Sequence, residues 1–552
     1  MKNKILLLIF SICLFQVTLT AKDDDTPVMQ YWRGGKMDLN FNALINYNIG
    51  TSSGLLSGIM SNAVESISLN PAVMPMQKTA FFFFEVKPGF GTNTLGMSSS
   101  DILSPQDIAE NSDDFLKDTA TFIFPSTNFR KDTEVGNLDM KASGGVTSVA
   151  VAFPIMRNLV FGASYNPVID IAADLFVNSI STNLKTTKEV GNTQTAIDMI
   201  LHPTIGLNTS LKMNKTSFAL GYNFMPGDKG ALSAGITFNR YQVRNYIDLN
   251  INIDGMIVLN NGPEYYFNDP GDQNIDASKG ESNKLFMKAR GDFKSTKWGF
   301  TLGAFFDPSG IVDGLSFMNI SMALDIVPEF SLEDKKAKLE SLQPKFLTGK
   351  FNGKDEEELD IIIDSLDLAK PNLTKQTKNV FTDKVLLSLP SSFTLGFDFK
   401  LGEHTLVLNY VNYFKEFSYK FDKYKLGKTP NTGIRFGADF RMPDELSGWN
   451  WAYLPLRLLY LDFDGLIFQA LSRYSHYKDS HYRVAGGVML GDAIVEGFSD
   501  DDKDSMKDAL GIPIPTSFTL SRKYTVFDKM NIGVAVMGFP DILMKFSFGY
   551  AL

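Results

Sequence analysis

Large apolar residues alternate with small or polar residues along many short stretches of this chain. In residues 216–224, Phe218, Leu220, Tyr222 and Phe224 are separated by serine, alanine, glycine and asparagine. Successive side chains of a strand point to opposite faces, so this stretch predicts a strand with one large apolar face and one small or polar face. The alternation recurs in residues 149–153, 159–165, 232–239, 298–303, 318–324, 393–400, 433–441 and 544–552.

The extent of this pattern decides between two β architectures. A soluble β-sandwich also alternates, but its large residues fill a finite core. Here the alternation runs from residue 79 to the end of the chain, with many short turns. Strands with apolar side chains outside and polar side chains inside a closed barrel accommodate all of it. We therefore predict an all-β fold, a transmembrane antiparallel β-barrel over residues 79–552.

Composition fits a barrel and excludes a membrane protein built of helices. A helix needs a run of about 20 apolar residues to span a bilayer, and the chain has no internal run of that kind. Barrel strands escape such a scan because alternate residues are polar. The 45 phenylalanines could supply a lipid-facing band, although a large aromatic core would also need them.

Residues 1–21 have the features of a secretory signal peptide. Lys2 and Lys4 precede an apolar run, and small and polar residues follow up to Ala21, after which we expect cleavage. Cys13, the only cysteine, lies in this segment, so the mature chain has no disulfide and no thiol chemistry. Loss of the two lysines changes the formal net charge from −9 to −11, which argues against nucleic-acid binding.

Residues 22–78 show little alternation, and none of them is predicted to form a barrel strand. The segment is rich in glycine, serine and asparagine and ends with Asn70, Pro71, Ala72 and a second proline, Pro75. Two prolines so close together force extended or turn geometry and exclude a helix interior. Such a segment could be a globular plug or an N-terminal linker.

Specific residues of this segment resemble a known family. Residues 52–55 read Ser-Ser-Gly-Leu, Asn70, Pro71 and Ala72 follow, and a hydrophobic strand starts at Thr79. The arrangement resembles the N-terminal hatch of FadL-type outer-membrane fatty-acid transporters, which include TodX-type hydrocarbon channels. The resemblance covers the whole mature chain. It implies a barrel of 14 strands whose lumen is plugged by a hatch formed by the residues before the first strand.

The third predicted strand runs into Tyr165, Asn166 and Pro167. Proline has no amide hydrogen, so a wall strand that contains it loses a ladder hydrogen bond and must bend or gap. The family resemblance implies a lateral opening here, through which apolar substrate enters the membrane. In the alternative interpretation, Pro167 simply ends the strand.

Residues 331–383 have a different texture. Leucines recur among charged residues after Ser331, and a second such stretch follows an acidic run at residues 355–358. We expect two amphipathic helices in a long outer loop. By the family resemblance they would lie beside a groove that collects substrate; an acidic cap without a ligand fits the pattern equally well.

We predict no catalytic residues, no metal site and no cofactor. Four histidines are too few and too scattered for a metal cluster, and no phosphate-binding glycine loop is present. Lys400, Arg435 and Arg441 fall on the inward face by parity, where they could contact a ligand carboxylate or pair with acids such as Asp398 and Asp439.

The predicted function is passive uptake of hydrophobic molecules, such as long-chain fatty acids or similar lipids, across the outer membrane of a diderm bacterium. The solute would pass a plugged lumen and leave sideways at the third strand. The protein would be integral to the bilayer and inserted by the outer-membrane assembly machinery. The alternative function is a barrel of the same type that serves as a secretion-system shuttle or anchor, or as a surface antigen.

Overall fold

The computed structural model describes most of the predicted barrel and short parts of the N-terminal region. It covers residues 36–45, 56, 67–76, 79–87, 138–139, 145–178, 182–190, 193–225, 231–259, 264–267, 285–310, 313–344, 347–349, 359–361, 373–374, 384–402, 404–442, 477–497, 503, 507, 514–526, 530–538 and 543–552. The predicted signal peptide lies outside these residues, as does the apolar stretch 456–468.

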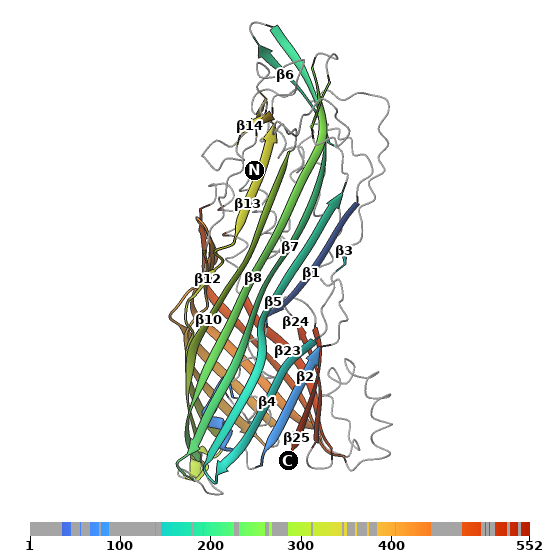
Figure 1. The fold of residues 1–552 in the computed structure, drawn as a ribbon. Coiled ribbons are helices and arrows are strands. Elements are labelled where there is room, and N and C mark those ends of the chain that lie inside the picture. The colour runs from blue at the N-terminus through green and yellow to red at the C-terminus, as the bar shows by residue number, and fades with distance from the viewer. Residues whose placement is uncertain are drawn as a thin grey trace.

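Antiparallel strands form a closed ring in this part of the chain (Figure 1). Each strand of the ring pairs with the next, and the last pairs with the first. The described residues supply fourteen strands to it: β2 (Phe81–Lys87), β4 (Gly145–Met156), β5 (Leu159–Asn178), β7 (Thr193–Asn223), β8 (Ala231–Leu259), β10 (Phe286–Asp307), β11 (Met318–Ile326), β18 (Ser392–Leu401), β19 (His404–Tyr413), β21 (Tyr424–Met442), β22 (Tyr477–Glu496), β23 (Ile514–Val526), β24 (Met530–Gly538) and β25 (Leu543–Ala551). The predicted all-β antiparallel barrel is confirmed.

The alternation read from the sequence matches the two faces of this wall. Phe218 on β7 is 41% exposed, whereas its neighbour Ser217 is fully buried. Phe218 lies in register with Phe238 on β8, which lies in register with Phe300 on β10, and all three are exposed. Large apolar side chains thus form continuous rows on the outside, while serine, threonine and asparagine face inward.

Four neighbouring strands, β5, β7, β8 and β10, continue far beyond the ring at the end opposite the C-terminus (Figure 1). The hairpin of β6 (Thr182–Val190) with β7 lies at their tip, and β9 (Glu264–Phe267) pairs with β8. The sequence predicted only the lower part of β7 and β8, because the upper part has no clear alternation of large apolar and small residues.

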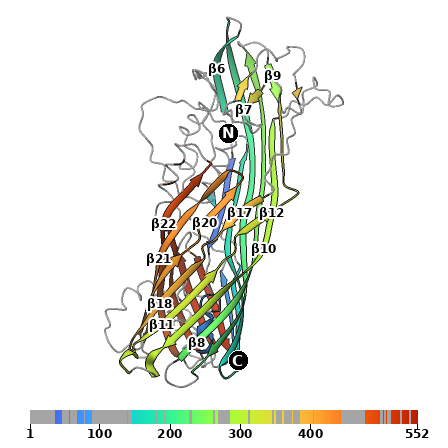
Figure 2. The same ribbon diagram turned by 90° about the vertical axis from the view of Figure 1, so that its left-hand side faces the viewer.

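Three short strands face this extension. They are β12 (Phe330–Glu333), β17 (Lys384–Ser388) and β20 (Phe417–Phe421), which pair in this order and join the ring at β21 (Figure 2). The hydroxyl of Ser391 donates to the carbonyl oxygen of Val327 (3.2 Å) and accepts from its amide (3.0 Å). These bonds connect the residues just before β12 with the residues just after β17.

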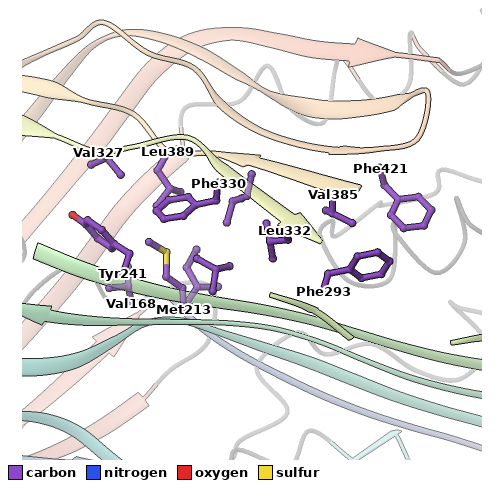
Figure 3. Close-up of a cluster of buried hydrophobic side chains, with 13 residues drawn as sticks. Val168, Met213, Tyr241, Phe293, Val327, Phe330, Leu332, Val385, Leu389 and Phe421 are labelled. Atoms are coloured by element: carbon purple, nitrogen blue, oxygen red, sulfur yellow. The ribbon is translucent and has the colours of Figure 1, made fainter. Parts of the chain in front are cut away.

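A cluster of buried apolar side chains lies between the four long strands and the three short ones (Figure 3). Rings of the long strands meet rings of the short ones edge-on. The centroid of Tyr241 lies 5.7 Å from that of Phe330, and the centroid of Phe293 lies 6.4 Å from that of Phe421. We call this set the upper apolar cluster; its buried members are Val168, Ile169, Met213, Tyr241, Val243, Phe293, Val327, Phe330, Leu332, Val385, Leu387, Leu389 and Phe421.

Residues 22–78 contain a strand that the sequence did not predict, although it is not one of the fourteen strands of the ring. β1 (Lys36–Ile45) pairs antiparallel with the upper part of β5, from Asn178 to Ile169 (Figure 1). It also pairs in parallel with β3 (Leu138–Asp139). Its sequence, Lys-Met-Asp-Leu-Asn-Phe-Asn-Ala-Leu-Ile, does alternate, but the edge of β5 that it covers is not visible from the local sequence.

The helices expected in residues 331–383 are absent from the described part of that segment. It contains β12, β13 (Lys338–Pro344), β14 (Leu347–Gly349), β15 (Leu359–Ile361) and β16 (Leu373–Thr374). Leu332 and Leu339 are buried, and their strands pair with β17 and β10. Pairing with existing strand edges outweighs the helical spacing of the leucines, as tertiary context often does.

Buried ion pairs occupy the inside of the wall. Lys545 Nζ on β25 lies 3.1 Å from Glu85 Oε1 on β2, where the ring closes, and neither side chain is exposed. Arg483 on β22 pairs with Asp439 on β21 at 3.0 Å. Buried charges need such partners because an isolated ion in a low-dielectric interior is costly.

Loss of one partner of the closing ion pair should destabilise the barrel. Lys545→Met leaves the Glu85 carboxylate buried and unpaired by any cation, which should lower the free energy of unfolding by about 3–5 kcal/mol. The matched control is Lys384→Met, which removes an exposed pair with Glu333 and should cost less than about 1 kcal/mol. Urea unfolding in bilayers measures both, and equal losses would contradict the prediction.

Candidate functional site

The short helix η3 (Pro71–Met76) lies inside the barrel against β5, β7, β8 and β10. Asn70, just before it, holds it in place. Its Oδ1 accepts a hydrogen bond from the amide of Ala72 (3.2 Å), and its Nδ2 donates to the carbonyl oxygen of Ala304 on β10 (3.3 Å) and to that of Leu56 (3.5 Å). One asparagine thus caps the turn and ties it to the wall.

Glycines on the inner face of the wall make room for this turn. A Cβ at Gly235 would lie 2.5 Å from the carbonyl carbon of Pro71 and 2.7 Å from the amide of Ala72. Gly221 on β7 and Gly303 on β10 approach Pro71 and Asn70 just as closely. The small side of the alternating pattern therefore has a specific role, because it lets a plug touch the backbone of three neighbouring strands.

The same plug has an apolar side. Ile67 and Met74 pack against Phe81 and Phe83 of β2 in one buried cluster. The run of four phenylalanines at residues 81–84 breaks the alternation, and the sequence predicted that its inner face would touch the plug. That contact is confirmed.

Polar side chains fasten the rest of the described plug. Thr237 on β8 donates to the carbonyl oxygen of Ile67 (2.6 Å), and Lys215 Nζ on β7 donates to that of Ser68 (3.3 Å). Beside them, a hydrogen-bond chain crosses four strands of the wall through Ser217, Asn239, Thr301 and Asp325, with distances of 2.7, 2.9 and 2.8 Å.

The strand ladder is interrupted beside the plug, at the third strand of the ring. β4 pairs with β5 only as far as Tyr165, and β1 pairs with β5 only from Ile169 onwards. Among the described residues, no strand pairs with residues 166–168 on that edge. The register with β7 shifts between Pro167 and Ile169, so Val168 and Ile169 are both buried, as expected for a bulge.

Pro167 does not end the strand, because β5 continues to Asn178. β4 carries a bulge of its own at the same level, where its register with β2 shifts between Glu85 and Val86. Thr147 and Ser148 are both buried there. Bulges bend strands, so two facing bulges account for the place where β4 and β5 part.

The three cations picked out from the sequence are held separately. Lys400 pairs with Asp307 at 3.2 Å near one end of the barrel, and the guanidinium of Arg435 donates to the hydroxyl of Tyr413 at 3.4 Å. Arg441 lies in β21, but its side chain is outside the described residues. Ligand contact at any of them stays a prediction.

The part of the chain that the structure describes contains neither a membrane-spanning helix nor a group of metal ligands. Among the described residues, no helix is both long enough and apolar enough to cross a membrane. Over the same ranges, no three His, Cys, Asp or Glu side chains are grouped so that they could hold a metal ion.

No protein-family model and no curated protein sequence matches the chain. Solved structures do match. The TbuX toluene transporter of Ralstonia pickettii is 9% identical, with 91% of this chain and 96% of that chain covered and a TM-score of 0.36. A FadL homologue of Pseudomonas aeruginosa is 12% identical, with 92% and 99% covered and a TM-score of 0.41. The chain is similar to FadL-type channels.

The TodX toluene transporter of Pseudomonas putida also matches, at 9% identity and a TM-score of 0.35, with 92% of this chain and 96% of that chain covered. Lys215 was not singled out from the sequence. Its signal is a lysine on the inward face of β7, two residues before Ser217 in a row of small side chains.

A side chain added at a plug-facing glycine should displace the plug. Gly235→Val places methyl groups where Pro71 and Ala72 now lie, and overpacking of this kind costs about 1–3 kcal/mol. The flux of small sugars into protein-containing liposomes should therefore rise. Gly206→Val on β7 is the matched control, because no atom lies within 4 Å of its added Cβ. Equal flux through both variants would show that the turn does not seal the lumen.

Proposed function

We propose that this protein is an outer-membrane channel for the passive uptake of hydrophobic molecules, which enter a plugged barrel and leave sideways at the third strand. The observation that carries the proposal is the interrupted ladder at residues 166–168 beside the plug. Unpaired backbone is costly in hydrocarbon, so a wall keeps such an interruption only where it is sealed by protein or lines a passage.

The outward side chains of β7, β8 and β10 change from apolar to aromatic to charged along the strands, and this order indicates where the bilayer would end. Phe218, Phe238 and Phe300 form an apolar row across β7, β8 and β10, and the next outward row upwards contains Tyr165, Thr216, Arg240 and Trp298. Two rows further, Lys212, Arg244 and Lys294 lie side by side. Aromatic residues concentrate at membrane interfaces and charged residues lie outside them.

The row of Lys212, Arg244 and Lys294 has exposed side chains, as expected for a surface in contact with water. Arg244 Nε lies 2.6 Å from Asp292 Oδ1, and this hydrogen bond from Arg244 lowers the pKa of the Asp292 carboxyl. The ladder interruption lies between this level and the aromatic row. A solute that leaves there would enter the outer leaflet near its boundary with water.

A sideways route is also supported by what lies towards each end of the lumen. The upper apolar cluster lies next to the extension and η3 lies inside the ring against the glycines, and we propose that together they close the lumen along its axis. An apolar solute can partition into the cluster at little cost, since the hydrophobic effect favours its transfer from water. No nucleotide-binding or other energy-coupling motif is present in the sequence, so the solute's own gradient would drive uptake.

Straightening the third strand should block uptake. In the variant with Pro167→Val and Val168 deleted, the bulge is removed, while Asn166 and Ile169 keep their inward facing. Initial uptake of a labelled long-chain fatty acid into proteoliposomes should fall at least about tenfold, which corresponds to about 1.4 kcal/mol of added barrier.

Pro154→Val is the matched control, because Pro154 also lies at a register shift but in β4, away from the interruption. It should leave uptake unchanged. Equal uptake by the straightened variant and the native protein would contradict sideways exit. No uptake by the native protein would contradict transport altogether and favour the shuttle, anchor or antigen alternative.

A further inference from the structure

Three rows of outward side chains on β7, β8 and β10 form a continuous polar patch next to the apolar rows of the wall. The three strands run side by side (Figure 1), and each row holds one residue from each strand in register. Tyr241 and Val243, which alternate with the members on β8, are 3% exposed and face inward. We call the nine outward residues the basic patch: Thr216, Arg240 and Trp298; Asn214, Gln242 and Thr296; and Lys212, Arg244 and Lys294.

The basic patch contains four cations and no carboxylate, although the whole chain has a formal net charge of −9. Two neighbouring acids neutralise it only in part. Asp292, two residues further from the bilayer on β10, lies 2.6 Å from Arg244 Nε and 2.7 Å from Lys294 Nζ, so one carboxylate serves two cations. Asp170 on β5 lies 3.6 Å from Lys212 Nζ. Two positive charges therefore remain in excess.

Arg240 is the cation of the patch nearest the bilayer, and no described carboxylate pairs with it. The ion pairs of the described residues on this face are Lys212–Asp170, Arg244–Asp292, Lys294–Asp292 and Arg290–Asp248. Arg240 lies in the same row as Trp298, which is 58% exposed, and the next row towards the bilayer centre holds the exposed Phe218, Phe238 and Phe300. A charged side chain beside hydrocarbon needs a counter-ion.

The patch spans more than one depth of the head-group region. Arg240 and Arg244 are four residues apart on β8, which is about 13 Å along the strand and about 9 Å along the bilayer normal for a strand tilted by about 45°. The guanidinium of Arg244 lies at Asp292, on the side away from Arg240. One phosphate group therefore cannot serve both levels, and a larger head group is needed to cover the patch.

We propose that the basic patch binds the phosphorylated head group of a glycolipid in the outer leaflet, with the acyl chains against the exposed phenylalanines. Arg240 binds a phosphate close to the acyl chains, because a guanidinium forms paired hydrogen bonds with phosphate oxygens. Asn214, Gln242 and Thr296 offer donors and acceptors to the sugar at the intermediate level. The row that contains Lys212 attracts a second phosphate at the outer level.

The charge and the extent of the patch together favour a glycolipid over an ordinary phospholipid. A phospholipid has one phosphate next to its acyl chains, so it would occupy the level of Arg240 and leave the outer row without a ligand. The inference goes beyond the proposed uptake, because it concerns a lipid of the bilayer held on the outside of the wall and not the solute that would pass through the lumen.

The test measures lipid binding to the full protein in detergent by native mass spectrometry. The probes are lipid A with two phosphates, the same lipid after phosphatase treatment, and phosphatidylglycerol. The native protein should bind the diphosphorylated lipid A at least about tenfold more tightly than either of the others. Equal binding of the two forms of lipid A would overturn the proposal, and equally tight binding of phosphatidylglycerol would overturn the assignment to a glycolipid.

Arg240→Gln should weaken binding of the diphosphorylated lipid A at least about tenfold. Because Arg240 has no described carboxylate partner, its removal leaves no acid without a cation, and the barrel should fold, as judged by heat-modifiable migration in gels. Lys212→Gln on the outer row should also weaken binding and decides the matter if Arg240→Gln does not fold.

Arg290→Gln is the matched control, because Arg290 lies on the same outward face of β10, is 74% exposed and pairs with Asp248 at 3.9 Å, but lies outside the patch. It should leave binding unchanged. Equal losses in Arg240→Gln and Arg290→Gln would show an unspecific attraction between charges and would overturn the site. Fatty-acid uptake is not measured in this experiment, so failure of the proposed uptake leaves its result unaffected.

Discussion

The fold depends on the need to pair every backbone N–H and C=O in the wall of the barrel. Fourteen strands of the described residues meet this need by closing on themselves, with β25 against β2 and the buried Lys545–Glu85 pair at the junction. In the described part of the ring the ladder has several register shifts, and at residues 166–168 of β5 one edge has no strand partner at all. There two bulges face each other, in β4 and in β5, and one of the two strands contains a proline with no N–H to offer. Both strands therefore contribute to the interruption, and Pro167 alone does not account for it.

The inner face of the wall is adapted to a plug that makes few but close contacts. Gly221, Gly235 and Gly303 line up on three adjacent strands, so the turn that starts at Asn70 touches the main chain of these strands. Asn70 satisfies its amide on the turn and on the wall at once. On its other side, Ile67 and Met74 belong to a cluster of eight buried side chains, smaller than the upper apolar cluster with its thirteen.

The sequence was sufficient for the barrel but not for what departs from it. A period of two over residues such as Phe218 to Phe224 predicts a wall strand because lipid and lumen make opposite demands on neighbouring side chains. β1 was missed because its partner, the upper edge of β5, is free only where β4 turns away. Leu332 and Leu339 were assigned to a helix by their spacing, but they lie in strands that pair with β17 and β10. Pro167 marked the interruption, whereas the contact of Lys215 with the plug became visible only in the structure.

The interruption of the ladder and the buried polar side chains around it lie at the same level of the wall. A gap in the ladder leaves backbone groups of residues 166–168 without strand partners on one edge, and hydrocarbon could not tolerate them. Buried polar side chains on both sides, from Glu85 to Lys215, make the inner surface of the wall polar at this level. A purely apolar lining would suit a greasy tail but would strand those backbone groups. This is the level at which we propose that a solute leaves the lumen for the membrane.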